Sequence, residues 1–340
     1  MSDFSWPDVL DAVAARRDLD PATVSAAMRA MLSGEATPAQ IAAFLTGMRT
    51  KGETTEEITA ALRTMQELAT PVKVDDAIDT CGTGGDRSGS VNISTMAAFV
   101  AAGAGARVAK HGNRSVSSSC GSADVLEALG VAIDLSPGGV AACVDEAGMG
   151  FMLAPSFHPG MRHVMPVRRE LGIRTLFNIV APLANPASVR RQVVGVADAQ
   201  LAPRIADVLA LARVQRAMVF RGDDGLDELS TTTTSRVWDV DGEVLESSLD
   251  PSSFLIERAT LDDLRGGDKE TNARIATGVF AGEHPRVADA VALNAAAALV
   301  VAGIAKDVND GLDRARESLS SGKAAGVLAR LRETSQRVAK

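Results

Sequence analysis

The sequence contains few aromatic residues and no excess of basic charge. Of its 340 residues only 3% are aromatic, tyrosine is absent, and the formal net charge is -8. Proteins that hold single-stranded nucleic acid combine a basic groove with aromatic side chains on which the bases stack. We therefore expect no nucleic-acid partner, and any anionic ligand must be held by a local cluster of backbone amides and a few cations.

Cysteine and long apolar runs are also scarce. The three cysteines, Cys81, Cys120 and Cys143, are widely spaced and form no CxxC pair, so we interpret them as small buried residues. The first ten residues, MSDFSWPDVL, lack the basic flank and apolar run of a secretory leader. No window approaches a membrane span. The sequence therefore predicts a cytoplasmic protein in a reducing compartment, with no membrane partner.

Four helix-start signals occur in the first seventy residues. In each, a capping residue precedes proline or acidic residues: Ser5 before Pro7, Asp20 before Pro21, Thr37 before Pro38, and Thr54 or Thr55 before Glu56 and Glu57. The apolar residues Ile41, Phe44, Leu45 and Met48 have helical spacing and predict a buried stripe. We predict an all-helical domain over residues 1–71, joined by helices from about 160–190.

From Val72 onward, short apolar runs alternate with helical segments. The runs predict strands at 77–81, 107–110, 131–135, 151–153 and 217–220, and the alanine-rich segments 96–105 and 288–303 predict crossing helices. Residues 72–340 are therefore expected to form a larger α/β domain with a mostly parallel central sheet. No long linker separates the two domains, so we expect a short hinge near Thr70 and Pro71.

Two segments with anion-binding features follow the first predicted strand. The run Asp79 to Asp86 holds three glycines in four positions, which lets backbone N–H groups turn toward an anion at the carboxyl end of a strand. Alone, it fits an ordinary tight turn equally well. Ser94 or Thr95 is predicted to cap a helix that starts near Met96, and such a helix N-terminus also favours phosphate.

The segment Lys110 to Arg114, with serines at 117–119, follows the next predicted strand. Its lysine and arginine supply cations and its hydroxyls can donate to phosphate oxygens. His111 fits three roles, as a base, as a donor to substrate or as a structural residue.

Asp227 and Glu228 follow the predicted strand at 217–220. Adjacent carboxylates suit Mg²⁺, which takes one or two of them while bridging substrate phosphates. Asp223 and Asp224 make a solvated acidic turn the alternative. Beside the phosphate segments, a metal site is the better interpretation.

In this order, GTGGD, NIST, KHGNR, HPGMR, PVRRELGIRTLFN and DGLDE resemble the anthranilate phosphoribosyltransferases, and the likeness continues through GGDKETNA and ALNAA over nearly the whole chain. KHGNR together with DGLDE is specific, whereas GTGGD is shared with nucleoside phosphorylases. The resemblance implies a Mg²⁺-dependent glycosyltransferase of tryptophan biosynthesis. It would transfer phosphoribosyl from phosphoribosyl pyrophosphate (PRPP) to the amine of anthranilate and release pyrophosphate.

The resemblance also implies a homodimer formed mainly through helices, with a site between the domains and two Mg²⁺ ions. The residues it assigns to PRPP are Gly82, Thr83, Gly84, Gly85, Asp86, Ser90, Asn92, Ser94, Thr95, Lys110, Asn113, Ser118, Ser119 and Ser122. Those it assigns to anthranilate are Gly82, His111, Asn113, His158, Arg168 and Pro182, with Arg168 nearest the carboxylate. Ser94, Asp227 and Glu228 would organise the metal. We assign no nucleophile or general base, because the neutral amine attacks with its own lone pair.

Four positions depart from the family pattern, and two alternative functions stay open. Gly160 and Arg162 replace a common alanine and lysine. Arg221 stands where the family commonly has histidine, and Ala181 stands where glycine is usual, so the range of acids accepted is left open. A pyrimidine nucleoside phosphorylase is one alternative, and Asp227 with Glu228 argues against it. A non-catalytic nucleic-acid-binding relative is the other, and the net charge argues against that.

Overall fold

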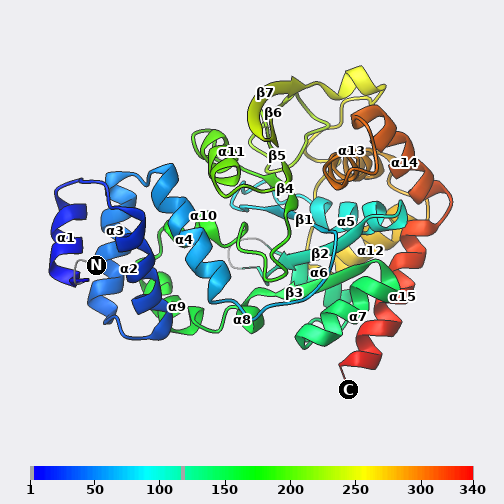
Figure 1. The fold of residues 1–340 in the computed structure, drawn as a ribbon. Helices are drawn as coiled ribbons and strands as arrows, with labels where there is room; N and C mark the ends of the chain where they lie inside the picture. The colour runs from blue at the N-terminus through cyan, green and yellow to red at the C-terminus, as the bar shows by residue number, and fades with distance from the viewer. Residues whose placement is uncertain (1–3, 116–118, 340) are drawn as a thin grey trace.

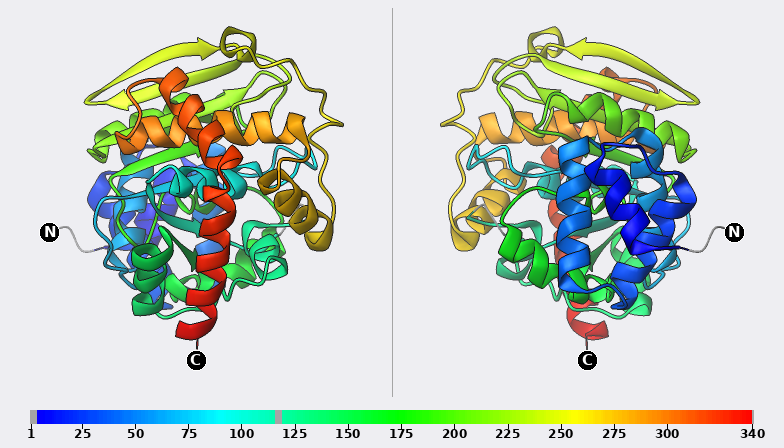
Figure 2. Two further views of the ribbon diagram at one scale, coloured as in Figure 1. Left: turned by 90° about the vertical axis from the view of Figure 1, so that its right-hand side faces the viewer. Right: turned by 90° about the vertical axis from the view of Figure 1, so that its left-hand side faces the viewer.

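The computed structural model describes residues 4–115 and 119–339. A bundle of helices at the N-terminus lies beside a larger α/β domain (Figure 1). Seen from its two sides, the molecule has the C-terminal helix in front on one side and the N-terminal helices in front on the other (Figure 2). The predicted fold class is confirmed.

Four helices form the N-terminal bundle: α1 (Trp6–Ala14), α2 (Pro21–Ser33), α3 (Pro38–Lys51) and α4 (Thr55–Glu67). Three predicted caps form, because the Asp20, Thr37 and Thr54 side chains accept backbone N–H groups of the first helical turn. Ser5 occupies the fourth cap position without a side-chain bond. The predicted stripe on α3 is buried, as shown by Phe44, which has no exposed surface.

The chain returns to this bundle after the third strand. The short helix α8 (Ala154–Phe157) leads to α9 (Met161–Leu171), which packs on α2 and α3, and α10 (Leu176–Val180) packs on α3 and α4. Their apolar residues share one hydrophobic cluster with the N-terminal helices. Helices α9 and α10 therefore pack on the helical bundle, although in the sequence they come between strands β3 and β4.

The sheet has seven strands in the order β3-β2-β1-β4-β5-β6-β7. The first five in that order are parallel, and the β6–β7 hairpin continues the sheet antiparallel to β5. The strands are β1 (Ala77–Gly82), β2 (Arg107–Gly112), β3 (Met149–Leu153), β4 (Arg191–Gly195), β5 (Arg216–Gly222), β6 (Ser235–Asp241) and β7 (Glu243–Leu249). Four predicted strands are confirmed as β1, β2, β3 and β5.

The predicted strand at 131–135 is wrong. Val131, Ile133 and Leu135 are buried in alternation, as in a half-buried strand. However, the backbone of this stretch bonds to side chains and helix ends: Ala132 N donates to the Ser335 hydroxyl, 3.1 Å away. Burial beneath a helix produced the alternating pattern without a neighbouring strand.

Helices cover both faces of the sheet. The predicted alanine-rich helices are α5 (Ile93–Gly103) and α13 (Pro285–Ala302), and both pack on the face that Val193 and Met218 share. On the opposite face, the neighbouring residues Val194 and Val219 contact α11 (Leu201–Leu211) and the bundle cluster. The remaining helices are α6 (Ser122–Ala128), α7 (Pro137–Ala147), α12 (Lys269–Phe280), α14 (Val308–Ser320) and α15 (Lys323–Val338), with a short 3₁₀ turn η1 (Pro251–Phe254).

Helix α13 is long and apolar enough to cross a membrane by length and composition alone. This finding corrects the prediction that no window approaches a membrane span. Since 72% of this helix is buried inside the protein, it is explained as a core helix against the sheet.

The order of the strands reverses at β1, which has β2 on one side and β4 on the other. Ligands of such sheets bind where the order reverses, at the carboxyl ends of the strands. The loop at 223–234 after β5 crosses this point in direct contact with β4. A Cβ atom built on Gly195 would lie only 1.6 Å from the backbone oxygen of Asp227. This close approach requires glycine.

We expect Gly195→Ala to destabilise the fold, because the added methyl must push the 223–234 loop away from β4. Overpacking of this kind costs about 1–3 kcal/mol of unfolding free energy, measurable by urea denaturation. The matched control is Gly138→Ala at the start of α7, where the nearest atom to a new Cβ is 4.0 Å away. That variant should be neutral or gain up to about 1 kcal/mol. Equal stability of the two variants would contradict the packing argument.

Candidate active site

The glycine-rich segment follows β1 as a loop that is hydrogen-bonded to the end of β4 and to the 223–234 loop. Thr83 N donates to Gly195 O at 2.9 Å, and Gly84 N donates to the Asp227 carboxylate at 2.7 Å. Gly84 and Gly85 have φ values of 62° and 80°, which favour glycine. One amide of the predicted phosphate loop thus already holds an anionic oxygen.

Side chains further along the loop form a polar cluster. Ser88 Oγ donates to Asp86 at 2.7 Å, and it lies within hydrogen-bonding distance of Ser90 Oγ, 3.0 Å away. The end of the loop pairs with residues 264–266, through Val91 N to Leu264 O at 2.9 Å. Ser88 therefore links Asp86 to Ser90 within the loop.

Helix α5 begins earlier than predicted. It starts at Ile93, so Ser94 and Thr95 lie in its first turn and neither caps it. Asn92 occupies the cap position but makes no cap bond, because its amide donates to Cys120 O at 3.2 Å and accepts from Asn272 at 2.9 Å. The capping prediction is wrong.

The free N–H groups at the start of α5 nevertheless face negative charge. Ser94 N donates to Glu228 Oε1 at 3.1 Å. The Thr95 hydroxyl is buried and has no hydrogen-bond partner among the described residues. The helix N-terminus thus provides anion-binding donors at the same edge of the sheet as the glycine-rich loop.

Lys110 lies beneath this edge, on β2, with only 2% of its surface exposed. Its Nζ donates to the backbone oxygen and the hydroxyl of Thr80. Burial lowers the pKa of Lys110, and the charge of Asp79 opposes that shift. The position of its amine nitrogen is therefore fixed in the floor of the site.

Asp79 on β1 is a buried carboxylate that the sequence analysis did not assign. It accepts His111 N at 3.2 Å and the Asn185 amide at 2.7 Å, and Asn185 also donates to Ala109 O at 2.8 Å. Burial raises the pKa of Asp79 to about 6, although Lys110 opposes the shift. Asn185 thereby joins the segment after α10 to β1 and β2.

His111 and His158 lie with their ring centroids 5.1 Å apart. His158 Nε2 is 3.0 Å from Ala184 O, so it must carry the proton that is donated. His111 Nε2 is buried with no partner in the described part of the chain. Burial lowers the pKa of His111 to about 3 and that of His158 to about 4. Both rings are neutral near pH 7, and the low pKa of His111 makes it a weak proton acceptor, which disfavours it as a base.

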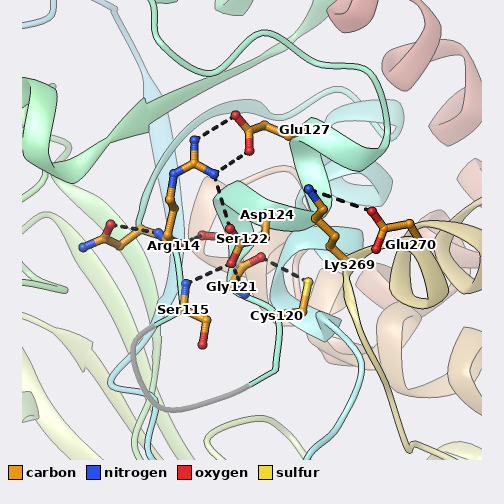
Figure 3. A network of polar contacts seen from close by, with 10 residues as sticks. Arg114, Ser115, Cys120, Gly121, Ser122, Asp124, Glu127, Lys269 and Glu270 are labelled. Carbon is orange, nitrogen blue, oxygen red and sulfur yellow. Dashed lines mark hydrogen bonds and ion pairs between the residues drawn. The ribbon is translucent and has the colours of Figure 1, made fainter.

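The segment after β2 is shown in Figure 3. Arg114 bonds to Glu127, with one distance of 2.8 Å, and reaches Asp124 at 3.4 Å. These carboxylates on α6 neutralise the arginine, so it does not supply the cation that the sequence predicted.

The other predicted residues of this segment remain at the surface. Asn113 is exposed, and Ser122 Oγ donates to its backbone oxygen at 3.3 Å. Ser119 Oγ donates to Gly267 O at 2.8 Å. Ser118 lies outside the described residues.

Asp227 and Glu228 are brought together with the glycine-rich loop and α5 by the bonds to Gly84 and Ser94. Burial and the charge of Asp86 raise the pKa of Asp227 to about 6. Burial and Asp227 raise the pKa of Glu228 well above its usual range. Neither carboxylate forms an ion pair in the described part of the chain.

This pair fits a divalent cation that binds together with a ligand. Among residues 4–115 and 119–339, no group of three or more His, Cys, Asp or Glu side chains is placed to hold a metal ion. Two carboxylates and the Ser94 hydroxyl would leave coordination positions open, as Mg²⁺ requires when it bridges phosphates.

Arg168 lies in the last turn of α9 without an acidic partner among the described residues. Its Nη2 donates to Asn178 Oδ1 at 3.1 Å, and its guanidinium carbon lies 5.6 Å from the centroid of the Phe177 ring. Burial lowers its pKa. A half-buried guanidinium with spare donors is suited to a carboxylate ligand. Pro182, also predicted, follows α10 and is half-buried.

The chain matches family models over both domains. The "Glycosyl transferase family, a/b domain" matches residues 74–325 and the "Glycosyl transferase family, helical bundle domain" matches residues 7–69. A curated anthranilate phosphoribosyltransferase of Nocardioides sp. is 54% identical over 333 residues, covering 96% of this chain and 97% of that protein.

Two solved structures share the fold over nearly their whole length. The anthranilate phosphoribosyltransferase of Thermus thermophilus matches with a TM-score of 0.92 and 41% identity, covering 97% of this chain and 99% of its own. The Saccharomyces cerevisiae enzyme in complex with PRPP and Mg matches with a TM-score of 0.89 and 27% identity, covering 99% of each chain.

We expect Asp79→Asn to change how stability depends on pH. The pKa of Asp79 is about 6 in the folded protein, above its ordinary value of 3.8. As the pH falls from 7 to 4, the folded state therefore takes up a proton that the unfolded chain does not, and this group's contribution to stability increases. Asparagine cannot contribute in this way. The melting-temperature difference, wild type minus variant, should be larger at pH 5 than at pH 7.5, and equal differences would refute the burial of this carboxylate.

Proposed function

The chain belongs to the anthranilate phosphoribosyltransferase family, and on this premise we propose how its residues divide the work of the reaction. The enzyme transfers phosphoribosyl from PRPP to the amine of anthranilate and releases pyrophosphate. One observation supports the placement of its site best. The glycine-rich loop, the N-terminus of α5 and the pair Asp227–Glu228 converge at the point where the strand order reverses.

We propose that PRPP binds against the amides of this edge. The N–H groups of Gly84 and Ser94 each hold a carboxylate oxygen in the structure, which marks them as donors to anionic oxygens. Phosphate oxygens would take such donors in the complex. The residues proposed to surround PRPP are those of the sequence analysis: Gly82, Thr83, Gly84, Gly85, Asp86, Ser90, Asn92, Ser94, Thr95, Lys110, Asn113, Ser118, Ser119 and Ser122.

Ser94, Asp227 and Glu228 would hold Mg²⁺, and we propose two ions. Bound Mg²⁺ would neutralise the charge that develops on pyrophosphate as it leaves. Lys110 contributes a fixed positive charge from below, which costs no reorganisation during the reaction because its position is set by Thr80.

Anthranilate is proposed to bind on the other side of the ribose, among Gly82, His111, Asn113, His158, Arg168 and Pro182. Arg168 would bind the carboxylate with two parallel hydrogen bonds. The rings of His111 and His158 are neutral and provide a flat lining. His158 also borders a cavity of about 560 Å³ between α2 and residues 158–163, which we propose as part of the entry path. Positioning of the amine does the remaining work, and no general base is assigned.

The domain division and the assembly also belong to this proposal. Residues 1–71 with helices from about 160–190 would form one domain and residues 72–340 the other, since α9 and α10 share the apolar cluster of the bundle. We propose a cytoplasmic homodimer that associates mainly through helices. Phe4 and Leu68, at 39% and 40% exposed, place apolar surface on the bundle in support of this.

Purified protein with anthranilate, PRPP and Mg²⁺ should consume anthranilate and form the phosphoribosyl adduct, and EDTA should abolish turnover. Asp227→Asn with Glu228→Gln should lower kcat at least about 100-fold, because several kcal/mol of charge stabilisation are lost. The control is Asp223→Asn, an exposed carboxylate of the same loop, which should keep its activity. Full activity of the double variant would remove the metal assignment.

Arg168→Ala should lower kcat/KM for anthranilate by about 10- to 150-fold, the value of a hydrogen bond to a charged group at about 1.5–3 kcal/mol. Arg168→Lys should recover part of this loss, because it keeps the charge but lacks the planar fork. Arg169→Ala, an exposed neighbour on the same helix, is the control. KM for each substrate and the melting temperature should be measured together. An unchanged anthranilate KM in Arg168→Ala would exclude this residue from the site.

A further inference from the structure

Three cations of the α/β domain are already engaged by protein groups. Lys110 bonds to Thr80, and Arg114 bonds to Glu127 and Asp124. Arg221, at the end of β5, donates through Nε to Ala197 O at 2.9 Å. These bonds reduce the number of hydrogen-bond donors that each of the three side chains can direct at the phosphates of PRPP.

Arg174 differs from these cations. It lies in the turn between α9 and α10, and its half-buried guanidinium makes no hydrogen bond or ion pair with any described residue. Its Nη1 lies 3.4 Å from the position that a Cβ atom on Gly85 would occupy. Its charge also acts on Asp227, whose pKa it lowers against the effect of burial. A guanidinium without a protein partner among the described residues therefore lies beside the glycine-rich loop, whose Gly84 N–H donates to Asp227.

The backbone of this turn is held firmly by the helical bundle. Arg49, in the last turn of α3, donates through Nη1 to Arg174 O at 2.5 Å. The next residue, Thr175, is buried and donates through N to Asn178 Oδ1 at 2.9 Å. That same amide oxygen accepts the Nη2 of Arg168. Arg174 and Arg168 are thus linked through one hydrogen-bonded segment, residues 174–178, which we call the corner.

We propose that Arg174 is a further binding residue for PRPP and that it contacts the pyrophosphate group. A guanidinium binds phosphate oxygens through a planar fork of donors. The proximity to Gly85 and Asp227 selects the pyrophosphate side, because the metal-binding carboxylates stand there. Arg174 reaches the α/β domain from a segment that packs on the helical bundle. Its contact with pyrophosphate fixes the corner that also holds Arg168, so the first substrate helps to position the residue proposed for the second. This inference rests on the proposed function.

The test uses inorganic pyrophosphate with Mg²⁺ as the probe, titrated calorimetrically into the whole protein. Arg174→Gln should raise the Kd of pyrophosphate by about 10- to 150-fold and Arg174→Lys by less, in keeping with a charged hydrogen bond. The KM for PRPP should rise in parallel, while the KM for anthranilate at saturating PRPP changes much less. Arg169→Gln, an exposed arginine on α9, should behave as the wild type.

Arg49→Ala tests whether the bond from Arg49 to Arg174 O positions Arg174. This variant removes that bond and keeps the side chain of Arg174. It should raise the Kd of pyrophosphate in the same direction but by a smaller factor. An unchanged Kd in Arg174→Gln overturns the proposal. So does a lowered melting temperature with an equal rise in both KM values, because that result describes a structural residue. If the wild type shows no turnover, the proposed function fails, and the pyrophosphate titration still decides the role of Arg174.

Discussion

The close approach of the 223–234 loop to the ends of β1 and β4 is the contact on which the rest of the site depends. The Asp227 carboxylate would lie 2.6 Å from a Cβ atom on Gly82, and its backbone oxygen would lie 1.6 Å from one on Gly195. Because two glycines leave this space open, two carboxylates reach the amides of Gly84 and Ser94. Burial raises the pKa of both, so their negatively charged forms are disfavoured at this position. A site built in this way favours binding of a cation together with a phosphorylated substrate.

Two parts of the proposed site are held by different parts of the fold. We call them the floor, within the α/β domain, and the cover, which packs on the helical bundle. The floor is the buried network of Asp79, Lys110 and Asn185, whose hydrogen bonds join β1, β2 and the segment after α10. Partners of this kind are costly to remove singly, because each would leave another polar group unpaired. The cover is the corner at 174–178, whose supports come from α3 and α9. Movement of the 174–178 segment relative to the floor would therefore displace Arg168 and Arg174 together and leave the amides of Gly84 and Ser94 in place.

The sequence predicted correctly those helices and strands that are specified by neighbouring residues in the chain. Prolines and capping residues located the N-terminal helices, and the short apolar runs located four strands. The sequence analysis missed β4, which begins with two polar residues, and the β6–β7 hairpin, although Asp241-Gly242 is a turn signal. The errors at 131–135 and at the start of α5 share one reason. Burial beneath α15 and bonds from Asn92 to distant partners are tertiary effects that no local pattern records. The role of Arg114 was missed in the same way, because Glu127 lies thirteen positions away and reaches it only once α6 has formed.

Two of the four departures from the family pattern, at Ala181 and Arg221, acquire a physical interpretation from the structure. Ala181 has φ of -59° and ψ of -43°, an ordinary helical conformation, so replacement of glycine imposes no strain there. Its methyl group packs against the apolar cluster of the bundle. Arg221 is held by its bond to Ala197 O, which directs it along the edge of β4. Neither side chain contributes a bond to Asp227, Glu228 or Arg168. The contacts that define both halves of the proposed site are therefore independent of these two substitutions.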